Sequence, residues 1–148
     1  MEKIKFKMAT VAMSLILTFT LYSCGCSCYL EKNITNAEAL KPQIATLIES
    51  AKDSIQLHQT EINVVNNSID EAIAYNLTRT RCKAQKKQWN LLKNGFTGTY
   101  DVFLSDWKKY SVQPEIMINK FIKDINIILD NIIKNENLLK ANKQKCNQ

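Results

Sequence analysis

Apolar positions recur along the chain with alternating spacings of three and four residues. One series comprises Ile44, Ile48, Ala51, Ile55, Ile62, Val65, Ile69 and Ala72. A second comprises Ile118, Phe121, Ile125, Ile128, Ile132 and Leu139, with Asn135 in its gap. This spacing is typical of helices that pack along other helices. Three glycines and two prolines are too few for an all-β fold with its frequent turns, so the sequence predicts an all-α protein.

The apolar series and the breaks between them predict an elongated up-down-up bundle of three helices, over residues 36–76, 77–110 and 114–143. Gly95 and Gly98 interrupt the second helix, and Thr99 caps the short helical piece that follows. Pro114 suits the first turn of the last helix.

A second arrangement stays open, because nothing between residues 74 and 80 forces a turn. In this helical hairpin one helix runs unbroken over residues 36–94, and a short helix over residues 99–110 crosses its end. The last helix then returns antiparallel to the first.

The start of the helical domain is marked by Thr35 and Glu38, which have the spacing of a capping box. Pro42 lacks a backbone donor, so the helix either kinks there or begins near residue 41. We therefore place a single helical domain at residues 36–148. The one histidine, His58, falls in the first apolar series, and we interpret it as a structural residue in a helix seam.

The N-terminus has the charge and hydropathy order of an export signal. Lys3, Lys5 and Lys7 precede a charge-free run over residues 8–22, which is shorter than the roughly 20 residues of a membrane-spanning helix. The charge-free stretch continues to residue 30, so an uncleaved signal anchor is the alternative.

The run ends in Leu21-Tyr22-Ser23-Cys24, which resembles the lipobox of bacterial lipoprotein precursors. Leu21 and Ser23 match the pattern, and Tyr22 departs from it, since the family prefers a smaller or β-branched residue there. The resemblance implies that Cys24 is acylated after removal of a signal peptide at residues 1–23. Two or three acyl chains make attachment stable, because each buried methylene contributes about 0.8 kcal/mol.

Lipidation at Cys24 would make residues 24–35 a lipidated tether, which we expect to be poorly ordered. The richness of the chain in Lys, Asn and Ile is similar to that of small helical surface lipoproteins of spirochaetes. The expected location is the bacterial cell envelope, with the protein lipid-anchored at the outer membrane or cell surface.

Charge is unevenly distributed, within a formal net charge of +6. Residues 77–93 contain no acid, and their cations are Arg79, Arg81, Lys83, Lys86, Lys87 and Lys93. This segment is a candidate site for an anionic macromolecule such as a polysaccharide, nucleic acid or lipid headgroup, with Trp89 as a stacking surface. The simpler interpretation is a solvated helix face.

The cysteines suggest a disulfide, since exported proteins meet an oxidising compartment. In the up-down-up bundle Cys82 and Cys146 lie at the same end, which predicts a bond between them. Cys26 and Cys28 are expected to be free or to pair between molecules. With Cys24 they do not form a metal site, because structural zinc needs four ligands at wider spacing.

The chain has no glycine-rich phosphate loop, no zinc motif and no nucleophile-base pattern around His58, so we predict neither an enzyme nor a cofactor. The first hypothesis is a binding module that presents its bundle to a host or envelope partner. The second is a structural envelope lipoprotein that forms a homo-oligomer through its coiled-coil seams.

Overall fold

The computed structural model describes residues 28–80 and 82–146, with side chains described up to residue 142. Within this part of the chain there are helices and no strands, which confirms the all-α fold class. Its α-helices are α2 (Glu31–Glu49), α3 (Gln59–Arg79), α4 (Lys83–Leu92), α5 (Thr99–Tyr110) and α6 (Glu115–Cys146).

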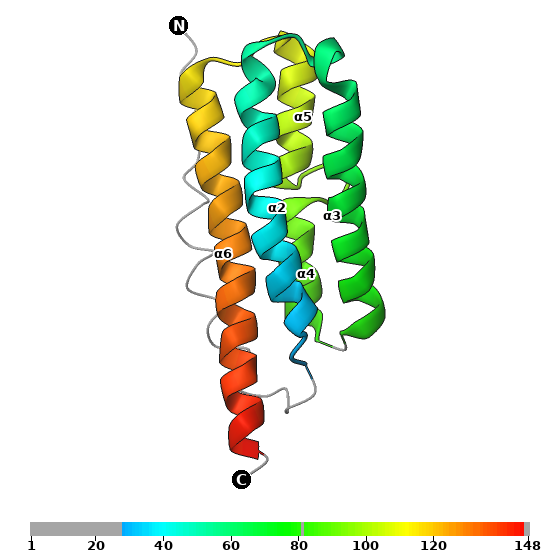
Figure 1. The fold of residues 1–148 in the computed structure, drawn as a ribbon, viewed down its shortest axis with the longest axis vertical. Coiled ribbons are helices and arrows are strands. Elements are labelled where there is room, and N and C mark those ends of the chain that lie inside the picture. The colour runs from blue at the N-terminus through cyan, green and yellow to red at the C-terminus, as the bar shows by residue number, and fades with distance from the viewer. Residues whose placement is uncertain (1–27, 81, 147–148) are drawn as a thin grey trace, which may run out of the picture.

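The helices form an elongated bundle of antiparallel rods (Figure 1). α2 runs up, α3 runs down, α4 and α5 follow one another upward, and α6 runs down the full length of the bundle beside α2. We call the end at which α2 and α4 begin and α3 ends the near pole. The opposite end, where α2 turns into α3 and α5 into α6, is the far pole. The near pole is the lower end in Figure 1.

The predicted helix over residues 36–76 is wrong, because the chain reverses direction between α2 and α3. Two short 3₁₀ turns, Ser50–Lys52 and Ile55–His58, flank Asp53 and Ser54, whose ψ angles of 172° and 135° are extended. Ala51 and Ile55 are buried in this turn. The buried positions therefore continue with the spacing of a helix although the α-helix has already ended. Three up-down-up helices are therefore replaced by four rods, of which α4 and α5 together form one.

The ends of the other helices test the second predicted arrangement, the helical hairpin. α3 ends at Arg79 and α4 begins at Lys83, so the alternative of one helix over residues 36–94 is also wrong. The break at the glycines is confirmed between α4 and α5. A Cβ at Gly98 would lie 2.6 Å from the carbonyl oxygen of Leu92, so this close approach requires glycine.

The helical domain begins earlier than the sequence predicted. α2 starts at Glu31, which places Thr35 and Glu38 inside the helix and rules out their capping box. The helix also continues through Pro42 to Glu49. Cys28 is already buried, so residues 28–35 belong to the fold and not to a tether, and the domain boundary at residue 36 is wrong.

The core runs the whole length of the bundle. Its aromatic part lies toward the far pole, where Phe103 of α5 packs against Trp107 and against Phe121 of α6, each at 5.5 Å between ring centroids. The seam positions of both apolar series are buried within the chain, as in Ile48, Ile69 and Ile125, except Ile128, which is only partly buried beside the fully buried Leu129. Burial of this apolar surface is the main favourable term in folding.

Candidate functional site

A buried carboxylate, Glu136 of α6, forms the centre of a polar network at the near pole. Its side chain is only 1% exposed. One oxygen, Oε1, accepts hydrogen bonds from Asn33 Nδ2 at 2.7 Å and from Gln85 Nε2, and Oε2 accepts one from the backbone N–H of Leu30 at 2.9 Å. The network therefore joins α2, α4 and α6 and the residues before α2.

Gln85 extends this network to the end of α3. Its Nε2 also donates to the carbonyl oxygen of Cys28 at 2.6 Å, and its Oε1 accepts from the hydroxyl of Thr80. The Thr80 oxygen in turn accepts from the backbone N–H of Cys82 at 3.1 Å. We call Asn33, Thr80, Gln85 and Glu136 the Glu136 cluster. All four side chains are buried.

A disulfide closes the same pole. Cys28 and Cys82 are bonded, with 5.9 Å between their Cα atoms, and both are buried beside Leu139. The bond connects the residues before α2 to the residue before α4, next to the Glu136 cluster. Covalent and hydrogen-bonded contacts thus fasten the start of the described chain to the bundle.

The predicted Cys82–Cys146 disulfide is wrong, because Cys82 is bonded to Cys28. The expectation that Cys28 is free or pairs between molecules is wrong for the same reason. The prediction assumed that the fold begins at residue 36, which excluded Cys28 as a partner. The Cys146 side chain lies outside the described side chains.

Burial controls the protonation of Glu136. Loss of solvation raises the pKa of this carboxyl above its ordinary value of 4.5, and the hydrogen bonds from Leu30, Asn33 and Gln85 reverse only part of that shift. The folded protein therefore holds the proton more tightly than the unfolded chain does. Protonated Glu136 therefore contributes to the free energy of unfolding. This contribution is complete at a pH below the pKa of Glu136 in the unfolded chain, and it is lost as the pH rises through the pKa of Glu136 in the folded protein.

We predict that Glu136→Gln removes this part of the pH dependence. The wild-type protein should lose stability relative to the variant as the pH rises from about 4 to about 8, since only the wild type has an ionising group at position 136. The measurement is urea denaturation of both proteins, with the disulfide intact, at several pH values in this range. A difference that stays constant, or that grows in favour of the wild type with rising pH, would contradict the raised pKa.

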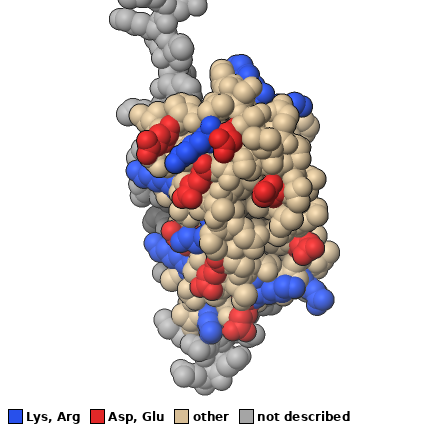
Figure 2. Space-filling view, turned by 45° about the horizontal axis from the view of Figure 1, so that its top comes forward, with Lys and Arg blue, Asp and Glu red and all other residues tan. Residues whose placement is uncertain are grey.

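The basic segment 77–93 is divided by the fold. Arg79, Lys83, Lys86 and Lys87 lie at the near pole, in the last turn of α3 and the first turns of α4. Lys93, at the far end of α4, pairs with both carboxylate oxygens of Asp70 at 2.7 Å, so it does not lack a counter-charge. Figure 2 shows Lys and Arg side chains gathered at its lower right edge, where α3 ends. Arg81 lies outside the described residues.

The proposed stacking role of Trp89 is wrong. Its side chain is 1% exposed and belongs to the hydrophobic core, so its ring is not accessible to a partner. α4 turns Trp89 and Leu92 inward and leaves Lys83 and Lys87 exposed. The spacing of Trp89 and Leu92 was the sequence signal for this orientation.

His58 lies at the far pole, in the turn before α3, and not in a helix seam. Its ring centroid is 5.7 Å from that of Trp107, and its Nε2 is 3.9 Å from a carboxylate oxygen of Asp53. Trp107 Nε1 donates to the carbonyl oxygen of Asp53 at 2.9 Å. The histidine is thus packed into the α2–α3 turn together with the tryptophan that covers it.

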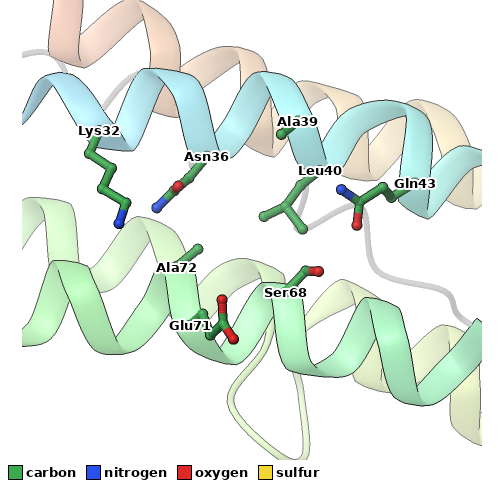
Figure 3. A pocket seen from close by; sticks show the side chains of 8 residues that line it. All are labelled: Lys32, Asn36, Ala39, Leu40, Gln43, Ser68, Glu71 and Ala72. Atoms are coloured by element: carbon green, nitrogen blue, oxygen red, sulfur yellow. The ribbon is translucent and has the colours of Figure 1, made fainter.

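A shallow groove of about 190 Å³ lies between α2 and α3 (Figure 3). Its lining side chains are Lys32, Asn36, Ala39, Leu40, Gln43, Ser68, Glu71 and Ala72. Figure 3 shows side chains of the two helices facing one another across it, with Lys32 and Glu71 as its charged members. The groove contains no histidine or cysteine, so the Ser68 hydroxyl has no imidazole base beside it there, and the lining offers hydrogen bonds and charge.

The described residues contain neither a cluster of metal ligands nor a membrane-spanning helix. No group of three or more His, Cys, Asp or Glu side chains among them is arranged to hold a metal ion. None of the described helices combines the length and apolar character needed to cross a bilayer. The predicted lipobox with Cys24 lies outside the described residues, and so do Cys26 and the apolar run at residues 8–22.

The described fold is therefore an all-α bundle with a buried polar cluster and a disulfide at its near pole. Comparisons of the chain with models of known families, with curated proteins and with solved structures found no match.

Proposed function

We propose that this chain is a bacterial cell-envelope lipoprotein, anchored through acylated Cys24 at the outer membrane or cell surface, whose bundle acts as a binding module. The lipobox at residues 21–24 is the sequence basis for the anchor. The Cys28–Cys82 bond supports export, because disulfides form and persist in oxidising compartments. In this role the protein has no enzymatic activity and needs no cofactor.

The observation that carries this proposal is the position of Cys28. It is buried and bonded at the near pole only four residues after Cys24. Four residues span at most about 14 Å even when fully extended. An acyl group on Cys24 would therefore hold the near pole close to the membrane surface, and the far pole would point away from it.

A binding role draws support from the far pole. Exposed apolar side chains gather on its two connections and the adjoining helix ends: Leu57 (72% exposed), Tyr110, Val112 and Ile116 (77% exposed). The backbone N–H of Gln113 donates to the carbonyl oxygen of Ala51 at 2.8 Å, which ties one connection to the other. Apolar side chains on such a fixed surface are typical of contacts with a protein partner.

Self-association through coiled-coil seams, the alternative role, has less support. The seam residues of the described helices pack against one another within a single chain, so none of these seams remains for a second copy. Light scattering of the lipid-free protein distinguishes the two roles. A monomer agrees with the binding module, and a dimer or larger species favours the self-associating lipoprotein.

Attachment at Cys24 is tested by mass spectrometry of the protein purified from its native membrane. We predict a mature N-terminus at Cys24 that carries diacylglycerol and fatty-acid mass. Cys24→Ser should lose that mass and retain the leader, because the thioether requires the cysteine sulfur. A protein that keeps its original N-terminus and carries no fatty acid would overturn the proposal in favour of a signal-anchored membrane protein. Labelling of intact cells with a membrane-impermeant reagent then tests surface exposure.

A further inference from the structure

We propose that the near pole binds the anionic headgroups of the membrane in which the protein is anchored. This inference deepens the proposed function and rests on it for the position of the membrane, since Cys24 lies four residues before the buried Cys28. The surface involved is the cationic near pole, which extends well beyond the basic segment that the sequence singled out.

Cations outnumber exposed acids at this pole. Seven described cations lie close to the Glu136 cluster, each within four residues along the chain of one of its members. They are Lys32, Arg79, Lys83, Lys86, Lys87, Lys134 and Lys140. Glu31 is the one exposed acid in the same described set, and the exposed Glu71, which lies outside the set, lines the groove together with Lys32. Glu136 itself is buried and faces inward. The far-pole connections, residues 50–58 and 111–114, contain one lysine and one aspartate besides His58.

Tyrosines lie among these cations. The Nζ of Lys32 lies 4.9 Å from the ring centroid of Tyr75, and the guanidinium of Arg79 lies 6.0 Å from the same ring. Across the pole, Lys140 Nζ lies 5.9 Å from the ring centroid of Tyr29. The hydroxyl of Tyr29 is buried, so only Tyr75 is suited to the boundary between headgroups and water. There tyrosine and long basic side chains each combine an apolar body with a polar end.

The position of Cys24, four residues before Cys28, favours a membrane over other anionic partners. The cationic surface surrounds the point at which the chain leads back toward Cys24, so acylation would hold it against headgroups. A basic side chain near an anionic bilayer contributes about 1 kcal/mol, or about fivefold in affinity, and this attraction decays within a Debye length. Cations at the far pole would be too distant from the headgroups to be attracted to them.

The test uses the unacylated chain over residues 25–148, which retains every described residue and does not depend on Cys24. We expect it to sediment with phosphatidylglycerol-containing vesicles at low salt, and not with phosphatidylcholine vesicles. Lys83→Gln, Lys87→Gln and Lys140→Gln together should weaken this binding about 100-fold. The matched control combines Lys52→Gln, Lys108→Gln and Lys109→Gln, which removes the same charge from the far-pole half of the molecule and should change binding less than about threefold.

If the two triple variants lost the same amount of affinity for the vesicles, binding would depend on net charge alone, and the inference would be overturned. So would binding that persists in about 0.5 M salt, where such attraction is screened, or the absence of binding to anionic vesicles. Tighter binding to heparin than to vesicles at equal anionic charge would assign the pole to a polysaccharide and also overturn it. Failure of the proposed anchor is seen separately, in the mass of the native N-terminus.

Discussion

Replacement of Cys28 and Cys82 by serine is expected to lower the free energy of unfolding by about 4 kcal/mol. The disulfide links residues separated by 54 positions, and closing a loop of that length restricts the unfolded chain by about this amount. The loss should appear as a lower urea midpoint of the unacylated protein, and reduction of the wild type should reproduce it.

Cys146→Ser is the control for this prediction. It should leave the free energy of unfolding unchanged, because Cys82 is already bonded to Cys28. Peptide mapping without reduction should recover the Cys28 peptide joined to the Cys82 peptide. A Cys146 peptide joined to Cys82, together with a stability loss in Cys146→Ser, would restore the pairing that the sequence predicted.

Glu136→Leu is expected to destabilise the folded protein by about 3 kcal/mol at pH 7. Leucine has a similar volume but accepts no hydrogen bond, so the Leu30 N–H and the Asn33 and Gln85 amides lose a buried acceptor. Each buried donor left unpaired costs about 1–3 kcal/mol, and relief of the buried charge offsets part of the total. Urea denaturation of the disulfide-bonded protein measures the difference.

Glu38→Leu is the matched control, because it makes the same replacement at an exposed glutamate in the middle of the adjoining helix α2. It should change stability by less than about 0.5 kcal/mol. If Glu136→Leu proved as stable as the wild type, the cost of burying the carboxylate would outweigh its three hydrogen bonds. The Glu136 cluster would then not stabilise the near pole.

Glu136 also shows what the apolar pattern missed in the candidate site. It lies four residues after Ile132 and three before Leu139, which is a core position in the last helix, yet the pattern was interpreted with Asn135 in the gap. An acid at a seam position is the signal that was present. Its partners could not be predicted, because Asn33 and Gln85 meet it only after three helices have packed together.

The fold was predictable where backbone constraints are local. The glycines between α4 and α5 and the Ser111–Pro114 break both end helices, and α6 begins next to Pro114. The α2–α3 turn was missed, although Asp53 and Ser54 are common at helix ends. Trp107 from the distant α5 covers this turn and bonds to it, so tertiary contacts decide what local preference leaves open.

The Cys28–Cys82 bond has a mechanical consequence. A pulling force applied to the chain ahead of Cys28 reaches the start of α4 directly through the sulfur atoms, and does not first peel α2 away from α6. Helices dissociate at low force when they are unzipped from one end, since their contacts then break one after another. An oxidised molecule would resist a pull on the chain ahead of Cys28 as a single body, whereas a reduced one would yield first along α2.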